Sequence, residues 1–136
     1  MRNIVVDTGP LIALFDGSDQ FHEQAKHFLQ SSSGLLHSNL AVITETVYML
    51  DFSAQAQRDF LTWAGQALII DRDTAHDIPR ILQVLSKYAD LPADFADASL
   101  VALCERLNTQ LVASVDKDFS IYRSNSKKPF TNLFFS

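Results

Sequence analysis

Residues 2–14, RNIVVDTGPLIAL, are the stretch that decides the fold: a short apolar run ends on Asp7 and is followed at once by turn residues. This arrangement is typical of a buried strand that feeds a helix, with Pro10 suited to the first helical turn. Asp7 is therefore expected at the carboxyl end of a strand. In open α/β sheets ligands bind at that edge, where loops and helix N-termini surround a crevice. An acid there can also be a plain cap, so a chemical role depends on other acids reaching the same place.

The composition predicts a soluble globular protein. The chain has 136 residues, 47% of them hydrophobic and 20% charged, which suits one domain over residues 1–136. No apolar run approaches the ~18 residues of a membrane span, and Asp7 and Pro10 interrupt any signal-peptide pattern. We therefore expect a cytoplasmic protein without membrane contact. The lone cysteine, Cys104, excludes an internal disulfide and a thiolate zinc site.

Apolar segments and helical patterns alternate along the chain. Short apolar runs predict strands near residues 4–6, 35–37, 67–70 and 111–115, with a last edge strand near 130–135. Helical spacing behind Ser, Asn or Asp caps predicts helices near residues 18–32, 40–52, 53–67, 73–88 and 93–107. Strands that alternate with helices indicate an α/β fold around a parallel sheet. Residues 124–128, SNSKK, are predicted to form a polar loop.

Glu45 occupies a helix position that the periodicity assigns to the core. The apolar stripe of residues 40–52 runs through Val42, Glu45, Met49 and Phe52. A lone carboxylate at a buried position is costly unless it is paired, hydrogen-bonded or bound to a metal. The alternative is a phase error of one residue, which would place Glu45 at the boundary with solvent.

Asp94 and Asp97 lie at the start of the helix predicted over residues 93–107. Asp97 extends a stripe that continues through Val101 and Cys104, which predicts that its carboxylate faces the interior. Asp94 lies three residues earlier, on roughly the same side. Acids in a first turn also cap free amides and complement the helix dipole. We favour this capping interpretation for Asp94 and not for Asp97.

Asp116 completes the group, because like Asp7 it follows a short apolar strand. Parallel strands place their carboxyl ends at one edge of the sheet, so these acids can converge on one pocket. Crowded carboxylates repel and raise one another's pKa unless a cation neutralises them. Oxygen ligands without histidine or cysteine select Mg²⁺ or Mn²⁺ over zinc, and the four histidines lack the spacing of a helical zinc site.

Such a site favours hydrolysis of a phosphodiester bond. Mg²⁺ held by a few carboxylates keeps waters and takes substrate phosphates as further ligands. It can activate one water as a nucleophile and stabilise charge on the leaving oxygen. Thr8 and Ser114 stand beside the strand-end acids, where a hydroxyl can orient a ligand or a water, or simply cap a turn.

The net charge of −5 argues against a protein that holds nucleic acid by bulk electrostatics. Setting aside the five acids above leaves eleven, as many as the Lys and Arg residues, and a bound metal would reverse the sign at the site. A basic group follows the last acid. Its members are Lys117, Arg123, Lys127 and Lys128. One hypothesis is that they contact substrate phosphates; the alternative is a solvated loop.

Four short motifs resemble those of PIN-domain nucleases in order and spacing, over essentially the whole chain. They are Asp7–Leu14 (DTGPLIAL), Thr44-Glu45, Asp97–Ala102 (DASLVA) and Ser114–Phe119 (SVDKDF). The resemblance implies a Rossmann-like, three-layer α/β/α sandwich with a central parallel sheet. It also implies an endoribonuclease that depends on Mg²⁺ or Mn²⁺.

The resemblance also implies a site and partners. The acidic quartet of the family, catalytic and metal-binding, corresponds here to Asp7, Glu45, Asp97 and Asp116. Asp7 and Asp97 are the expected direct ligands, and Asp94 has no firm counterpart. Ser114 stands where many members have threonine, which keeps the hydroxyl. Compact members are commonly VapC-type toxins of VapBC toxin–antitoxin pairs, which implies an RNA substrate, a small antitoxin partner and a homodimer.

Other interpretations of these acids fit less well. A receiver domain also binds Mg²⁺ at the end of a parallel sheet, but it needs paired acids where this chain has only Asp7. A haloacid-dehalogenase-like phosphatase needs a second aspartate at the position of Gly9. A PIN-like module that binds RNA or protein without cleaving stays open, because metal affinity depends on geometry. A nuclease assay with and without EDTA separates it from an enzyme.

Overall fold

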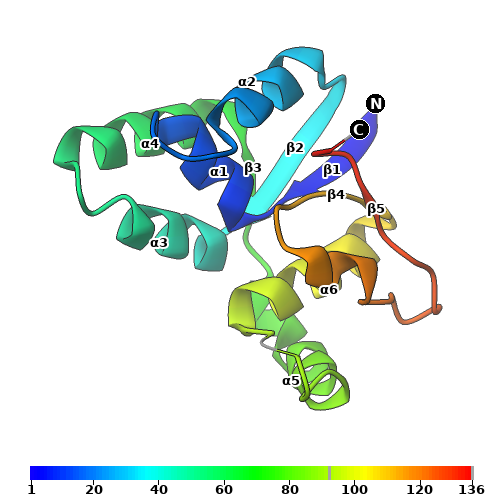
Figure 1. The fold of residues 1–136 in the computed structure, drawn as a ribbon. Helices are drawn as coiled ribbons and strands as arrows, with labels where there is room; N and C mark the ends of the chain where they lie inside the picture. Colours follow the sequence, from blue (N-terminus) through cyan, green and yellow to red (C-terminus); the bar gives the residue numbers. More distant parts are fainter. Residues whose placement is uncertain (92, 136) are drawn as a thin grey trace.

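The computed structural model describes residues 1–91 and 93–135, which form a three-layer α/β/α sandwich around a parallel sheet (Figure 1). The strands are β1 (Arg2–Val6), β2 (Gly34–Asn39), β3 (Ile69–Asp71), β4 (Leu111–Ala113) and β5 (Thr131–Asn132). Their order across the sheet is β3-β2-β1-β4-β5, and every neighbouring pair is parallel. The predicted fold class is confirmed.

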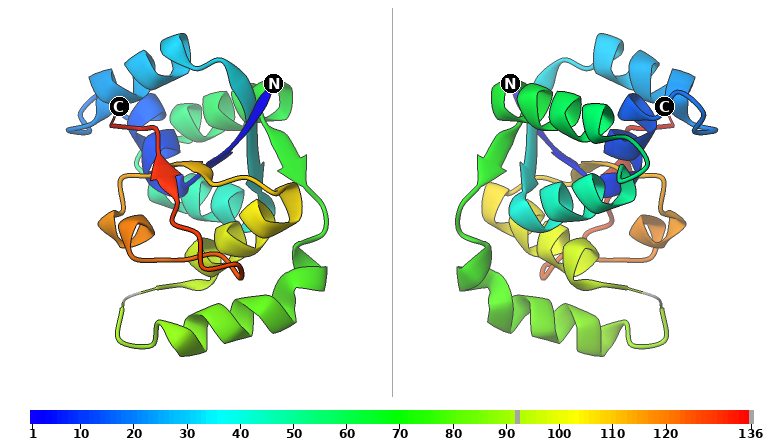
Figure 2. Two further views of the ribbon diagram at one scale, coloured as in Figure 1. Left: turned by 90° about the vertical axis from the view of Figure 1, so that its right-hand side faces the viewer. Right: turned by 90° about the vertical axis from the view of Figure 1, so that its left-hand side faces the viewer.

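Helices cover both faces of this sheet (Figure 2). They are α1 (Thr8–Phe15), α2 (His22–Ser31), α3 (Leu40–Met49), α4 (Ala54–Ala67), α5 (Ile78–Lys87) and α6 (Phe95–Leu107), with short 3₁₀ helices η1 (Thr74–Asp77) and η2 (Lys117–Ser120). The views place α1, α2 and α4 on one side and α5 and α6 on the other. Helix α3 contacts both α1 and α6. In the described part of the chain no helix has the length and apolar character needed to cross a bilayer.

The core explains why the central elements are nearly uniformly apolar. Ile4, Val5 and Val6 of β1 are buried, as expected for a central parallel strand covered on both faces. In α6 every residue from 96 to 104 is buried, because this helix lies against the sheet, α3 and α5. A Cβ atom at Gly9 would collide with the Val115 side chain, so only glycine lets the start of α1 approach the loop after β4.

The predicted elements are confirmed in order and type, but several bounds were wrong. Helix α2 begins at His22 rather than Ser18, because the Asp19 carboxylate accepts a hydrogen bond from Phe21 N (2.8 Å) and forms a turn first. The segment predicted as one helix over residues 73–88 is divided into η1 and α5. The helix predicted from residue 93 begins two residues later, behind its cap.

The last two strands are shorter than the apolar runs suggested. Strand β4 ends at Ala113 rather than Val115, because Ser114 pairs with the Asn132 side chain instead of with a neighbouring strand. The strand predicted over residues 130–135 is reduced to β5. Phe134 leaves the edge and packs into the core with Phe21 and Phe28. Burial of these rings, and not strand pairing, accounts for the aromatic C-terminal sequence.

Asn39 joins three elements beneath the carboxyl edge of the sheet. It is fully buried at the end of β2, and its Oδ1 atom accepts a hydrogen bond from Val42 N (3.1 Å) as the N-cap of α3. Its Nδ2 atom donates to Ser99 Oγ in α6 (2.9 Å). The Ser99 hydroxyl in turn donates to Ala96 O (2.7 Å).

We expect Asn39→Ala to lower the free energy of unfolding by about 2 kcal/mol, because the variant loses a helix cap and a buried hydrogen bond. Urea denaturation measures this change. Asn125→Ala, in an exposed loop, is the control and should stay within about 0.5 kcal/mol of the wild type. Equal stability of the two variants would contradict the proposed link between α3 and α6.

Candidate active site

Asp7 lies where β1 ends and α1 begins. Its backbone N donates to Ala113 O of β4 (2.9 Å), which extends the strand pairing to the edge of the sheet. Its Oδ1 atom accepts from Thr8 N (2.7 Å) and its Oδ2 atom from Ser114 Oγ (2.8 Å). Asp7 is therefore both a helix cap and a buried carboxylate held at the end of the central strands.

Ser114 connects the two acids that follow strands. Its hydroxyl donates to Asp7 and accepts a hydrogen bond from Asp116 N (2.9 Å). Asn132 fixes the backbone of Ser114 from β5, through bonds of 3.2 Å to its N and 2.8 Å to its O. The Asp116 carboxylate caps η2 by accepting from Asp118 N (2.8 Å). The ends of β1 and β4 thus bring Asp7 and Asp116 to the same edge.

Asp94 and Asp97 form a capping box at the start of α6. Asp94 Oδ1 accepts from Asp97 N (2.9 Å), and Asp97 Oδ2 accepts from Asp94 N (3.4 Å). The capping interpretation therefore applies to both residues, and our restriction of it to Asp94 was wrong. Asp97 is nevertheless buried, as its place on the apolar stripe of α6 predicted.

Glu45 lies at the boundary with solvent, so its predicted core position was wrong. The buried face of α3 consists of Val42, Ile43 and Thr46. Met49 and Phe52, which the predicted stripe placed in the core, are 54% and 61% exposed. The phase differs because α3 packs against α1 and α6 through the face that carries Val42, Ile43 and Thr46. The face of α3 that carries Glu45 therefore borders a hollow in the protein surface.

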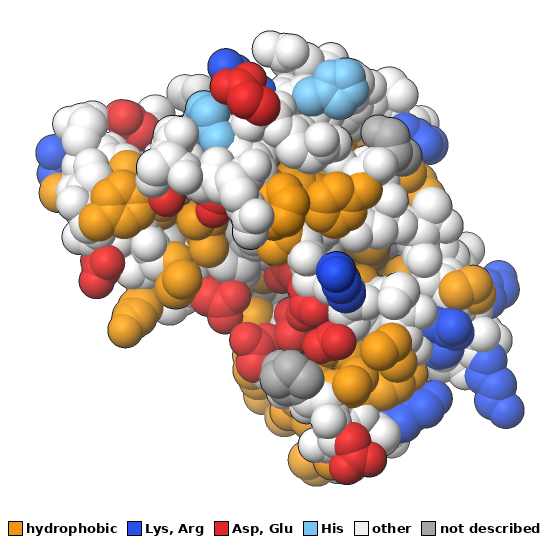
Figure 3. All heavy atoms as spheres, in the orientation of Figure 1, with side chains coloured by type: hydrophobic (Ala, Val, Ile, Leu, Met, Phe, Trp, Pro, Cys, Tyr) orange, Lys and Arg blue, Asp and Glu red, His pale blue; other side chains and the backbone are white. Residues whose placement is uncertain are grey.

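That hollow, of about 540 Å³, collects all five acids at the carboxyl edge of the sheet. Asp7, Glu45, Asp94, Asp97 and Asp116 line it together with Thr8. Acidic side chains gather near the middle of the face in Figure 3. The four residues of the predicted basic group are not among the described residues that line it.

The sequence interpretation missed the apolar rim of this hollow. Tyr48 and Met49 line it from α3, and Ile12 and Val115 line it from α1 and the loop after β4. Tyr48 and Met49 lie three and four residues after Glu45, which is the spacing of neighbours on one helix face. The sequence therefore showed that these residues lie on the same side of the helix as Glu45, but we predicted that this side would be buried in the core.

Burial dominates the electrostatics of the site. Burial, reinforced by the charges of Asp7, Asp94 and Asp116, raises the pKa of Asp97 to about 8. Burial raises the pKa of Asp7 to about 6, although hydrogen bonds from Thr8 and Ser114 oppose the rise. Burial also raises the pKa of Glu45, and the charge of Asp94 adds to the rise.

These donors fit a divalent cation. In residues 1–91 and 93–135, no Lys, Arg or His forms an ion pair with any of the five acids. The buried Thr8 Oγ1 atom has no hydrogen-bond partner among the described residues. An oxygen-only donor set suits Mg²⁺ or Mn²⁺. In the described ranges, no group of three or more Asp, Glu, His or Cys side chains is arranged so that it could hold a metal ion as it stands.

Comparisons with known proteins give a family match, a relative and a solved structure of similar fold. The family model for the PIN domain matches residues 4–124. Ribonuclease VapC26 of Mycobacterium tuberculosis (strain ATCC 25618 / H37Rv) is 26% identical over 132 residues, which cover 94% of this chain and 98% of that protein. The crystal structure of Mycobacterium tuberculosis VapC20, a Sarcin-Ricin loop cleaving toxin, has a TM-score of 0.80 at 23% identity and covers 87% of this chain and 93% of that one. The likeness to VapC20 shows that the fold is shared.

We expect the free energy of unfolding, measured in a metal chelator, to fall as the pH rises from about 5 to about 8. The pKa values of Asp97 and Asp7 in the folded protein, about 8 and about 6, lie above the ~3.9 of an unfolded aspartate. The folded state therefore binds more protons in this range, and stability decreases as these protons are lost.

Urea titrations at several pH values measure this slope. Asp97→Asn should flatten it, because the variant has no titrating carboxyl at that position. Asp51→Asn, at an exposed turn, should keep the slope of the wild type. The same slope in Asp97→Asn and in the wild type would show that Asp97 is not the group responsible.

Proposed function

Since this chain belongs to the PIN domain family, we propose that it is an endoribonuclease that hydrolyses RNA phosphodiester bonds with Mg²⁺ or Mn²⁺. One observation carries the proposal. Five carboxylates share a hollow at the carboxyl edge of the sheet, and no described cationic side chain neutralises them. The name of the relative Ribonuclease VapC26 supports RNA as the substrate.

In this proposal the metal ligands are Asp7, Glu45, Asp97 and Asp116, with Asp7 and Asp97 the most direct. When bound, the ion supplies an activated water and neutralises charge on the leaving oxygen. Ser114 positions Asp7 through its hydroxyl, and Asp94 positions Asp97 through the capping box. The unpartnered hydroxyl of Thr8 is available to hold a water or a phosphate oxygen.

We also propose partners beyond the substrate. The likeness to VapC26 and VapC20, the second of which is a toxin, supports a small antitoxin as a binding partner. A homodimer in solution is a further proposal, which rests on the resemblance of the sequence motifs to those of PIN-domain toxins. Purification of the chain together with the product of a neighbouring small gene tests the first, and sedimentation of the purified chain tests the second.

Purified protein should cleave a mixed RNA pool in Mg²⁺ or Mn²⁺. We expect EDTA, Asp7→Asn and Asp97→Asn each to reduce the rate by more than about 100-fold, because losing a ligand should cost at least as much as losing an outer-shell partner. Gel analysis of end-labelled RNA measures the rate. Asp51→Asn removes an exposed acid outside the hollow and should cleave like the wild type.

Two results would count against the enzyme. Cleavage that survives both substitutions would mean another site or a contaminant. RNA binding without cleavage in either metal would favour the non-cleaving PIN-like module.

The basic group that follows Asp116 remains a proposed contact for RNA phosphates. Arg123 Nη1 donates to the carbonyl oxygens of Ser120, Ile121 and Tyr122 at 2.8–2.9 Å, so part of its guanidinium caps η2. Lys117, Lys127 and Lys128 are exposed. Basic side chains gather at the right-hand edge of the face in Figure 3, beyond a hydrophobic patch. Such charges can bind the backbone on either side of the cleavage position.

We expect the double variant Lys127→Ala/Lys128→Ala to raise KM for RNA and to reduce the slope of log KM against log salt by up to about 2, one for each phosphate that the variant no longer neutralises. Cleavage rates between 50 and 200 mM salt measure the slope. Lys26→Ala/Arg58→Ala removes two exposed charges from α2 and α4 and is the matched control. An unchanged slope in the first variant would leave the lysines as a solvated loop.

A further inference from the structure

Tyr122 carries a buried hydroxyl whose role the fold alone does not explain. The residue is fully buried and is one of the largest side chains in the core. Its Oη atom has no hydrogen-bond partner among residues 1–91 and 93–135. Most buried polar groups of native proteins are hydrogen-bonded, and an unpaired one lowers stability. Phenylalanine would fill the same space without this loss, so the hydroxyl requires another explanation.

The surrounding structure fixes the position of the Tyr122 ring. This ring makes edge contacts with Phe119 and Tyr88, and the ring centroids are 5.1 Å apart in both pairs. The backbone N of Tyr122 donates to Asp118 O (3.0 Å) at η2, the short helix that the Asp116 carboxylate caps. The phenol is therefore held by the same turn that places Asp116 at the site.

The Tyr122 hydroxyl lies close to the acids of the site. Burial raises the pKa of this hydroxyl well above its ordinary range, and the charges of nearby carboxylates add to the rise. These carboxylates are Asp97, Asp116, Asp118 and Asp94, of which Asp97 has the largest effect. Three of the four line the acidic hollow. The phenol therefore stays protonated at neutral pH and can donate a hydrogen bond toward these acids.

Asp97 is the acid that most needs such a donor. Asp7, at the same edge of the sheet, accepts hydrogen bonds from Thr8 N and Ser114 Oγ at 2.7 and 2.8 Å. Asp97 is similarly buried, but within the described ranges its carboxylate accepts one bond only, a long one of 3.4 Å from Asp94 N. Carboxylates that bind metals are normally held by hydrogen bonds from an outer shell of residues. Asp97 can therefore accept a further bond without losing one.

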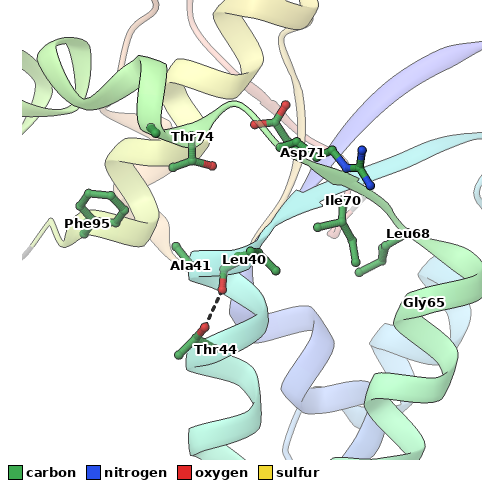
Figure 4. Close-up of a pocket in the computed structure, with 11 residues that line it drawn as sticks. Leu40, Ala41, Thr44, Gly65, Leu68, Ile70, Asp71, Thr74 and Phe95 are labelled. Carbon is green, nitrogen blue, oxygen red and sulfur yellow. Dashed lines mark hydrogen bonds between the residues drawn. The ribbon is translucent and has the colours of Figure 1, made fainter.

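Other hydroxyls near the start of α6 are already used. A second hollow, of about 360 Å³, adjoins the acidic one and leads into a groove of about 1010 Å³ (Figure 4). Thr44 lines both, and its Oγ1 atom donates to Leu40 O (2.7 Å), as the dashed line in Figure 4 shows. Within α6, Ser99 Oγ donates to Ala96 O (2.7 Å). Neither hydroxyl is therefore available to Asp97.

We propose that Tyr122 is a positioning residue of the acidic site, and that its hydroxyl donates through one ordered water to the Asp97 carboxylate when a divalent cation is bound. In the described part of the chain no direct bond joins the two groups, and a water bridge is nearly as favourable as a direct bond. Tyr122 is not among the described residues that line the acidic hollow, so it acts through Asp97. Thr8, whose hydroxyl is also unpartnered, lines the hollow and meets ligands directly.

The inference rests on the proposed function and deepens it, because it adds a residue that orients a proposed metal ligand. The test measures Mn²⁺ binding by the loss of the free-ion signal in electron paramagnetic resonance, which does not depend on cleavage. Tyr122→Phe keeps the ring and removes the hydroxyl. We expect its Kd for Mn²⁺ to rise about tenfold, at the lower end of the roughly 10- to 100-fold effect of outer-shell partners.

Stability in EDTA separates this role from a structural one. The urea midpoint of metal-free Tyr122→Phe should equal or exceed that of the wild type, because the variant loses no hydrogen bond of the fold and removes an unpaired buried hydroxyl. RNA cleavage by the variant should fall at low Mn²⁺ and recover at saturating Mn²⁺.

Tyr88→Phe is the matched control, because its ring contacts that of Tyr122 but its hydroxyl has a structural partner. Tyr88 Oη accepts a hydrogen bond from Arg123 N (2.9 Å). Loss of this bond should lower the urea midpoint and leave the Kd for Mn²⁺ unchanged. The two neighbouring phenols should therefore respond in opposite ways.

Three results would overturn the inference. The first is a lower urea midpoint for Tyr122→Phe with an unchanged Kd for Mn²⁺, which would make the hydroxyl structural. If Asp97→Asn loses Mn²⁺ binding while Tyr122→Phe binds the ion like the wild type, the proposed function stands and the inference fails. If the wild type binds no Mn²⁺, both fail.

Discussion

The hydrogen bond from Ser114 Oγ to Asp7 Oδ2, at 2.8 Å, links the side chains at the ends of β1 and β4, the two paired strands on which the acidic site is built. The same hydroxyl accepts from Asp116 N, so one side chain sets the spacing of two acids. Burial removes most of the water that would stabilise the charged form of the Asp7 carboxylate. The hydrogen bond from Ser114 restores part of that stabilisation without neutralising the charge. The site therefore keeps an excess of negative charge that a bound cation can compensate.

The acids of the site also hold the fold together, so capping and metal binding are not alternatives here. Asp7, Asp94 and Asp116 each accept a backbone N–H at the start of a helix. A carboxylate has about four lone-pair sites, and a cap occupies one or two of them. The same bonds that begin α1, α6 and η2 thus orient oxygens toward the hollow. A substitution in this group acts on helix geometry and on the site together.

The sequence predicted what depends on local patterns. Apolar runs that end on Asp7 and Asp116, and the parallel sheet that brings them together, follow from residues close in the chain. The phase of α3 did not, because the buried face of a helix depends on what it packs against, and only the fold shows that Val42, Ile43 and Thr46 face α1 and α6. The place of Asp97 in a capping box was also missed. Its carboxylate both lies on the buried stripe of α6 and caps the helix, and we had treated these two roles as alternatives.

The wrong phase of α3 is itself informative about function. The stripe through Glu45, Met49 and Phe52 has the periodicity of a buried face, yet the fold leaves it in contact with water. Exposed apolar surface beside a polar site marks a place where something binds. Tyr48 lies on this side of α3, between the acidic hollow and the second one. In a sequence, an apolar helix stripe usually indicates burial in the core. The fold leaves this face of α3 uncovered, so burial in the core does not explain its apolar character. Binding is the better explanation.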